Sequence, residues 1–383
     1  MSLAPLPLLP VRPARIEAFA FRCPIATPVR TSFGTMHDRP ALYVRVEDHD
    51  GAVGWGEIWC NFPACGAEHR ARLLDTVLAP LATSRAFASP AEAFTWLGER
   101  TAVLAIQSGE PGPIAQGIAG IDLALWDLCA RRAGLPLWRL LGGLQDRIPV
   151  YASGINPDHP EKLVVARLAE GYEAFKLKIG FGAERDLRNL ATLRELLGPG
   201  VPLMVDANQG WSLQDACAIA PALREFGLGW LEEPLRADRP WAEWQQLARS
   251  TDIPLAAGEN LLGDAAFEAA MEAGALAVLQ PDLAKWGGIS GCWPVIARGL
   301  QRGLRYCPHF LGGGIGLLAS AHVLAAAGGD GMLEIDANPN PLRTELAGPL
   351  AVLHEGACSL GDAPGIGVTP DMKQLAEVVA RGC

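Results

Sequence analysis

The sequence predicts an α/β protein in which an N-terminal α+β capping domain precedes a modified (β/α) barrel of the TIM type. The 383-residue chain is long enough for one barrel of roughly 200–250 residues and a smaller domain. Half of its residues are hydrophobic, so a large buried core is available. Beyond Gly143, short apolar runs alternate about eight times with amphipathic stretches of helical period, which is typical of a parallel barrel.

Residues 1–130 are expected to form the capping domain. Apolar and polar residues alternate between Ile16 and Glu57, which predicts a small antiparallel sheet. From Ala67 to Leu141 the apolar residues recur with the period of a helix. Two loops are expected beside the sheet, at Pro24–Pro40 and Gly56–Gly66.

The barrel is expected over residues 131–354. Residues 355–383 are expected to form a tail that ends in a short helix, Met372–Ala380, and packs back on the capping domain. The predicted barrel strands are the apolar runs around Val150, Leu177, Met204, Leu231, Ala256, Val278, Arg305 and Leu333.

Charge and composition exclude several classes of protein. The formal charge is −10 and no basic stripe occurs, so we expect no nucleic-acid partner. The nine cysteines form no CxxC pair, which indicates reduced thiols and a cytoplasmic location. Residues 1–13 do not resemble a signal peptide, and the apolar stretch Gly312–Gly329 contains glycine and histidine, so we expect no membrane partner.

Ionisable residues stand at the ends of the predicted strands. From Lys178 onward, each follows the previous one after 23 to 28 residues, which is about the length of one strand, one helix and two short loops. All of them are therefore expected at the C-terminal mouth of the barrel, where barrel enzymes build their sites. The set is Lys176, Lys178, Asp206, Glu232, Glu259, Asp282, His309 and Glu334.

Three of these residues are carboxylates on successive strands: Asp206, Glu232 and Glu259. Oxygen ligands with room for water and substrate suit Mg²⁺, and without a cation the three would repel one another. We therefore expect one Mg²⁺ per subunit. The alternative is that the carboxylates pair with Lys or Arg as buried salt bridges.

The remaining charged groups suit acid–base chemistry. Lys176 and Lys178 lie two apart on one strand and so point to the same side, where a positive neighbour and a metal ion would lower a lysine pKa. Asp282 can orient the imidazole of His309 across the barrel from Lys178. Glu334, if protonated, could hydrogen-bond a substrate oxygen. Lys285 could hold the substrate or pair with an acid, and both residues are expected near the other ionisable groups.

The motifs that carry these residues resemble the enolase superfamily, and within it the mandelate racemase subgroup of the mandelate racemase/muconate lactonizing enzyme family. The Glu259 segment, Gly-Glu-Asn, favours this subgroup over the muconate lactonizing enzymes. The matching segments are Phe175–Lys178, Val205–Gln209, Leu231–Pro234, Gly258–Asn260, Gln280–Asp282 with Lys285, Pro308–Phe310 and the upstream run Gly117–Asp127.

The resemblance implies a Mg²⁺-dependent enzyme that removes the proton next to a carboxylate through an enolate. By the same match, Lys178 and the Asp282–His309 pair are expected to be opposed acid/base groups. Lys176, Asn208, Lys285 and Glu334 are expected to contact the substrate, a small carboxylic acid. We also expect a homo-oligomer.

The reaction depends on the substrate. We favour dehydration of a hydroxylated (sugar) acid to a 2-keto acid, with racemisation or epimerisation as the alternative. A catalytically inactive metal- or acid-binding protein would not need both bases, and a glycosidase would need only a carboxylate pair. Substrate specificity is expected to depend on two capping-domain loops, Thr31–Arg39 and Trp59–Cys65. Their candidate substrate contacts are His37, Arg39, Trp59, Asn61 and Phe62.

Overall fold

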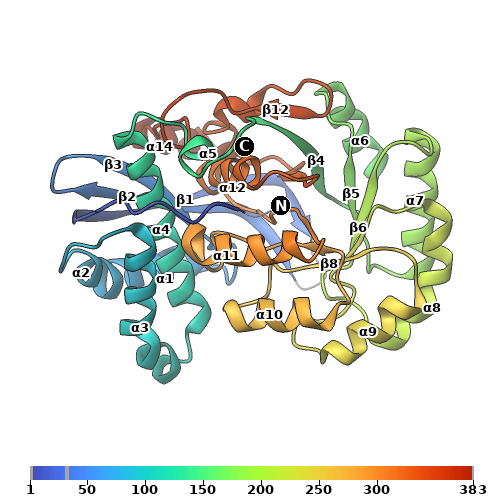
Figure 1. Cartoon of the computed structure of the whole chain (residues 1–383). Coiled ribbons are helices and arrows are strands. Elements are labelled where there is room, and N and C mark those ends of the chain that lie inside the picture. The colour runs from blue at the N-terminus through green and yellow to red at the C-terminus, as the bar shows by residue number, and fades with distance from the viewer. Residues whose placement is uncertain (1–2, 31–33, 382–383) are drawn as a thin grey trace.

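The computed structural model describes residues 3–30 and 34–381, and it confirms the predicted fold class. Figure 1 shows two parts. The small sheet lies at the left with helices α1–α3, and the curled parallel sheet lies at the right with helices α6–α9 along its outer edge. Within the described residues, no helix is both long enough and apolar enough to span a bilayer.

The capping sheet is antiparallel and has the order β1-β2-β3, with β1 at Pro13–Arg30, β2 at Thr35–Asp48 and β3 at Val53–Ile58. The predicted loop at Pro24–Pro40 was wrong, because β1 and β2 continue through most of it. Their pairing shifts register between Pro24 and Val29, and such an irregularity accommodates prolines, which cannot donate to the ladder. Residues 31–33 of the expected specificity loop lie outside the described residues.

The capping helices begin and end at recognisable signals. The Ser89 side chain accepts a hydrogen bond from the backbone N–H of Glu92 at the start of α3, and Gly109 ends that helix in the left-handed conformation. The helices are α1 (Gly66–Leu73), α2 (Ala79–Ala82), α3 (Pro90–Ser108), α4 (Pro111–Arg132) and α5 (Leu137–Leu140), with a π-helical turn at Leu74–Leu78.

Eight parallel strands form the curled sheet in the order β10-β9-β8-β7-β6-β5-β4-β11. Backbone pairing does not close the predicted barrel, because among the described residues β10 and β11 share no ladder. The two ends still meet: the Met332 N–H donates to the Cys307 sulfur at 3.4 Å. The strands are β4 (Arg147–Ile155), β5 (Phe175–Lys178), β6 (Leu203–Asp206), β7 (Leu231–Glu232), β8 (Leu255–Ala257), β9 (Val278–Leu279), β10 (Arg305–Tyr306) and β11 (Leu333–Asp336).

Helices follow these strands and cover the outside of the sheet. At the start of α8, Ser212 and Asp215 cap each other's backbone N–H groups, which fixes where that helix begins. The covering helices are α6 (Pro160–Ala169), α7 (Ala183–Leu197), α8 (Leu213–Leu223), α9 (Trp241–Ser250), α10 (Asp264–Ala273), α11 (Gly288–Gln301) and α12 (Gly314–Ala327).

The barrel interior is filled by one layer of side chains drawn from successive strands. Because neighbours in a strand face opposite sides, the alternate residues pack outward on the helices, as Phe175 and Leu177 do. This alternation aims Lys176 and Lys178 inward. The interior layer consists of Tyr151, Ala174, Met204, Trp230, Ala256, Val278 and Cys307.

The chain after β11 runs through α13 (Pro341–Thr344), β12 (Ala357–Ser359) and α14 (Met372–Arg381). Strand β12 pairs antiparallel with β4, and α14 packs against β1 of the capping sheet. The division into residues 1–130, 131–354 and 355–383 stays a prediction.

A buried carboxylate joins the capping helix α4 to the barrel. Asp122 accepts hydrogen bonds from the backbone N–H groups of Ile289 at 2.7 Å and Ser290 at 3.0 Å, at the N-terminus of α11. A side chain on Gly288 would collide with Asp122, so the close approach requires glycine there. Burial raises the pKa of Asp122 to about 7 despite these donors.

Asp122→Asn is expected to change how stability depends on pH. The folded protein keeps the Asp122 proton to about pH 7, whereas the unfolded chain loses it near its usual pKa of about 4. Asp122 therefore contributes stability at low pH that is lost as the pH rises towards 7, by roughly 2 kcal/mol between pH 5 and pH 7. Denaturant unfolding of wild type and variant at both pH values measures this difference. A difference that does not change with pH would mean that Asp122 is ionised throughout.

Candidate active site

The structure brings the predicted ionisable residues together at the carboxyl ends of the strands. Seven of the eight are buried, and Glu259 keeps 13% of its side-chain surface exposed. Lys178 and Asp206 are direct neighbours in the ladder between β5 and β6, and Asp206 and Glu232 are neighbours between β6 and β7. The placement at one mouth follows from parallel strands of similar length.

Lys176 lies at the bottom of the site, where its ammonium group pairs with two carboxylates. Its Nζ donates to both oxygens of Glu232, at 2.6 and 2.7 Å, and lies 2.8 Å from Glu334 Oε1. Burial lowers the pKa of an amine, but these two carboxylates outweigh it, and the pKa of Lys176 lies well above its usual value. The expected lowering was wrong for Lys176, because its nearest charges are negative.

Lys178 lies higher and borders the cavity. Its Nζ donates to Asn208 Oδ1 at 2.9 Å, and the Asn208 amide donates to Asp206 Oδ2 at 2.7 Å. Asn208 adopts a left-handed backbone conformation, φ 43°, which suits asparagine. The amide therefore places the amine next to the carboxylate without a direct ion pair.

His309 and Asp282 form the predicted pair. His309 Nδ1 lies 2.7 Å from Asp282 Oδ2, and Nε2 lies 2.9 Å from Glu259 Oε2. Burial lowers the pKa of an imidazole, but Glu259 and Glu334 outweigh it, and the pKa of His309 lies well above its usual value. These carboxylates thus favour the protonated form of His309, and its Nε2 faces Glu259.

Glu334 lies on β11 and accepts hydrogen bonds from two neighbours. The Ser153 hydroxyl donates to Glu334 Oε1, and the Phe310 N–H donates to Oε2 at 3.2 Å. Burial raises the pKa of a carboxyl group, but Lys176 and His309 outweigh it and lower the pKa of Glu334. Two neighbouring cations thus favour the carboxylate form of Glu334, and its expected hydrogen bond to a substrate oxygen, which needs the protonated form, stays a prediction.

Lys285 joins the barrel to the capping domain. Its Nζ donates to Glu259 Oε2 at 3.0 Å and to Asn260 Oδ1 at 2.9 Å, and it lies 4.8 Å from the ring centre of Trp59. A cation over an indole face is attracted by its π electrons. Lys285 thus lies between the carboxylate and the capping loop.

The three carboxylates fit a divalent cation by their chemistry. Asp206 is a buried carboxylate hydrogen-bonded to the backbone and side-chain amide of Asn208, and burial together with Glu259 raises its pKa. Burial, with Asp206 and Glu334, raises the pKa of Glu232 to about 7. A cation among them would relieve this cost of burying negative charge.

In the described part of the chain, however, no three His, Cys, Asp or Glu side chains already form a metal cluster. Lys176 holds both oxygens of Glu232, while Lys285 and His309 hold Glu259. Two of the three carboxylates, Glu232 and Glu259, therefore pair with lysine in this structure. This is the alternative that the sequence left open. A bound cation would have to compete with these partners.

A cavity of about 330 Å³ opens above these groups. Lys178, Asp206, Glu259, Lys285 and His309 border it from the barrel side, whereas Lys176 and Glu232 lie beneath it. Several of the other residues that line it lie outside the motif segments recognised in the sequence and were not predicted: Val29, Gln116, Ser153, Leu311 and Asp336.

The expected specificity loops contribute unequally. Trp59 and Phe62 line the cavity, and Asn61 donates to the Leu311 carbonyl at 2.6 Å. Arg39 is buried and ion-paired with Asp336 at the end of β11, so it joins the two domains. His37 is exposed on β2 and does not border the cavity.

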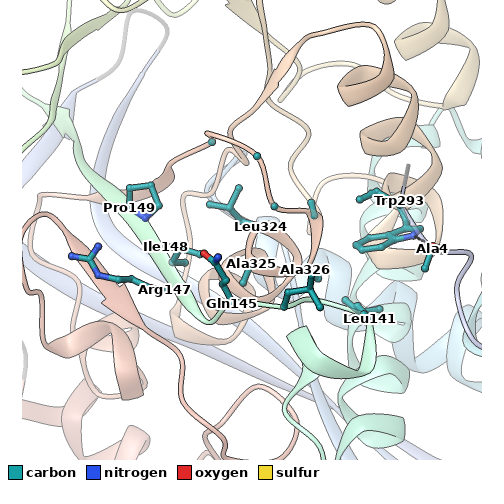
Figure 2. Close-up of a pocket in the computed structure, with 17 residues that line it drawn as sticks. Ala4, Leu141, Gln145, Arg147, Ile148, Pro149, Trp293, Leu324, Ala325 and Ala326 are labelled. Atoms are coloured by element: carbon teal, nitrogen blue, oxygen red, sulfur yellow. Dashed lines mark hydrogen bonds between the residues drawn. The ribbon is translucent and has the colours of Figure 1, made fainter. Parts of the chain in front are cut away.

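A larger hollow of about 430 Å³ lies at the opposite ends of the strands (Figure 2). Its walls come from the start of β4, the end of α12, Trp293 and the N-terminal residues Leu3 and Ala4. The lining is mostly apolar and contains no carboxylate or histidine. We therefore place the chemistry in the smaller cavity, where acids and bases converge.

Two family models match this chain. Residues 15–142 match the mandelate racemase/muconate lactonizing enzyme N-terminal domain, and residues 161–374 match the enolase C-terminal domain-like model. The chain belongs to the mandelate racemase/muconate lactonizing enzyme family of the enolase superfamily. This confirms the resemblance drawn from the motifs.

Relatives in this family carry out several reactions. A D-galactarolactone cycloisomerase from Agrobacterium fabrum is 31% identical over 92% of this chain and 94% of its own length. An L-talarate/galactarate dehydratase from Salmonella typhimurium is 36% identical over 68% of this chain and 65% of its own length. The chain is thus an enolase-superfamily enzyme whose relatives include dehydratases and isomerases.

Solved structures of family members agree with the fold. A mandelate racemase/muconate lactonizing enzyme from Bordetella bronchiseptica is 62% identical, with a TM-score of 0.92 over 96% of this chain and 99% of that one. A racemase from Streptomyces coelicolor, solved with bound magnesium, is 29% identical, with a TM-score of 0.84 over 95% of this chain and 99% of that one. Magnesium therefore occurs in this family.

Proposed function

We propose that this protein removes the proton alpha to the carboxylate of a hydroxylated acid and dehydrates the acid to a 2-keto acid. The observation that supports this most is that Lys178 and His309, which is paired with Asp282, border one cavity from strands that are not neighbours. A substrate between them would meet a base on one side and an acid on the other.

Asp206, Glu232 and Glu259 would hold one Mg²⁺. When bound, Mg²⁺ would stabilise the negative charge that collects on the substrate carboxylate as its α-proton leaves. Lys176 would balance the charge of Glu232 and Glu334 from beneath the cavity. Asn208 and Lys285 border the cavity and would orient the substrate.

Proton movement is then assigned to two groups. Lys178 Nζ, as the free amine, takes the α-proton and becomes an ammonium group. The electron pair of the broken C–H bond first collects on the substrate carboxylate as an enolate. In a second step this pair forms a carbon–carbon double bond and expels the β-hydroxyl, which His309 Nε2 protonates so that it leaves as water. The enol that remains becomes a 2-keto acid. Asp282 holds the other ring nitrogen and keeps Nε2 directed into the site.

Racemisation, epimerisation or cycloisomerisation is the second candidate. The capping side of the cavity carries the apolar residues Val29, Trp59 and Phe62, which suit a substrate with fewer hydroxyl groups on that side. If the substrate has no β-hydroxyl that can leave, the opposite group would return a proton to the carbon skeleton. The cycloisomerase and racemase relatives support this alternative.

Incubation with Mg²⁺ and a panel of acid sugars in heavy water is expected to separate the two candidates. Dehydration would yield a 2-keto acid, measured with a carbonyl reagent. Racemisation would instead introduce deuterium at the α-carbon without a keto acid, measured by NMR. Samples treated with a chelator serve as controls and are expected to be inactive. A panel that shows neither reaction would contradict the proposed enzyme and favour an inactive binding protein.

The homo-oligomer and the cytoplasmic location remain predictions. Light scattering on the purified protein measures the first, and fractionation of cells that express it measures the second.

A further inference from the structure

The capping side of the cavity carries one amide in a wall that is otherwise apolar. Among the described side chains of that domain, Val29, Trp59, Phe62 and Gln116 line the cavity. Gln116 lies on α4 and is only 7% exposed. A polar group in such a wall determines which substrate atom can be buried against it.

The orientation of the Gln116 amide is determined by Arg70. Arg70 Nε donates to Gln116 Oε1 at 2.9 Å. Since a guanidinium group has donors but no acceptor, the amide oxygen must face Arg70 and the NH₂ group must point away from it. Within the described residues Nε2 has no partner and yet is not sealed from solvent, so it presents donors to the cavity.

Arg70 is itself an unusual cation. It is 4% exposed, and no acidic side chain of the described residues forms an ion pair with it. It also donates to the Phe62 carbonyl at 3.2 Å, and its Nη1 lies 3.4 Å from His69 Nδ1. One guanidinium group therefore positions both Gln116 and the Phe62 backbone.

A buried cation without a carboxylate partner attracts negative charge. Arg70 lies directly behind the amide, so it polarises Gln116 and makes the NH₂ group a stronger donor. An anionic oxygen gains more from this arrangement than a hydroxyl group, because hydrogen bonds to charged acceptors are stronger.

We propose that Gln116 is a specificity-determining residue that donates to a second carboxylate of the substrate, at the end remote from the reacting carbon, and that Arg70 positions it. The substrate class is then a dicarboxylic acid. This rests on the proposed function for the role of the first carboxylate, which lies at the barrel end of the cavity.

Binding of a matched pair of non-reacting ligands tests this inference. Adipate and 6-hydroxyhexanoate have the same six-carbon chain and differ only in the distal carboxylate or hydroxyl group. Titration calorimetry with the Mg²⁺-loaded full chain is expected to show adipate binding roughly tenfold tighter. Equal affinities, or a preference for the hydroxy acid, would overturn the proposal.

Gln116→Glu is the sharpest variant, since it keeps the size of the side chain and replaces the donor with an anion beside Arg70. The preference for adipate is expected to reverse. Gln116→Leu and Arg70→Met are expected to abolish the preference, with 6-hydroxyhexanoate affinity nearly unchanged. Gln107→Leu, the same change at an exposed site on α3, is the control and is expected to keep the wild-type preference. A preference that survives in Gln116→Glu would contradict the role of Gln116.

The results that would contradict the proposed function differ from those that would contradict the distal carboxylate site. Selective binding of adipate without α-proton exchange on any acid would support the distal site and contradict the enzyme. Exchange or dehydration with no dicarboxylate preference would support the enzyme and contradict the distal site.

Discussion

Lys178→Ala is expected to lower α-proton removal by roughly 10³-fold or more while Mg²⁺ binding is kept. Lys178 Nζ borders the cavity and is held by a neutral amide, Asn208, rather than by a carboxylate. In the alanine variant the neighbouring amine, Lys176, could not replace Lys178, because Lys176 is ion-paired with Glu232 and Glu334. Deuterium wash-in and keto-acid formation measure the loss on an active substrate.

The control for this variant is Lys162→Ala, on the exposed surface of α6. It removes the same charge far from the cavity and is expected to keep full activity. Calorimetric titration with Mg²⁺ checks that the metal site survives in Lys178→Ala. Full activity of Lys178→Ala would remove Lys178 from the mechanism, and loss of Mg²⁺ binding would assign it to the metal site instead.

His309→Asn is expected to abolish turnover to a similar degree but to leave one reaction intact. If Lys178 removes the α-proton, the asparagine variant still exchanges that proton with solvent, yet it cannot protonate the departing hydroxyl. Deuterium wash-in should therefore continue while keto-acid formation falls roughly 10³-fold. Comparison of the two rates on one substrate separates the acid from the base.

His354→Asn is the matched control, because His354 is exposed at the far end of the barrel strands and should not affect either rate. Equal loss of exchange and dehydration in His309→Asn would mean that His309 acts before the proton leaves. Unchanged dehydration would show that another group protonates the hydroxyl.

These two predictions depend on one geometric arrangement. Lys178 ends β5 and His309 follows β10, so the path of the sheet separates them by four strands, yet both border one cavity. Asp206 and Glu259 lie between them along that path and also border the cavity. In the proposed function this order places the base on one side of the oxygen ligands and the acid on the other.

Sequence patterning was enough to predict the fold and the position of the ionisable residues at the strand ends. Apolar runs near Val150, Met204 and Val278 became strands, because an inward-facing core needs the same alternation in every strand. Regular spacing of Lys178, Asp206 and Glu232 was enough to place them at one mouth, since parallel strands of equal length end together.

The local irregularities of the capping hairpin were not predictable in the same way. Pro24 and Pro28 suggest a loop, but β1 continues around them through a shift in register. Whether a proline ends a strand or lies in a bulge depends on the neighbouring strand, here β2, and therefore on a partner that is distant in the sequence.

By itself the sequence determined the fold, the family and which residues reach the mouth of the barrel, because these depend on periodicity and spacing along the chain. Only the tertiary structure decided which charge lies against which. It placed Lys176 between Glu232 and Glu334, lowered the pKa of Glu334, and oriented the Gln116 amide in the cavity wall through Arg70. The charge state and direction of a side chain depend on burial and on neighbours from other strands and from the other domain, and neither is written in the local sequence.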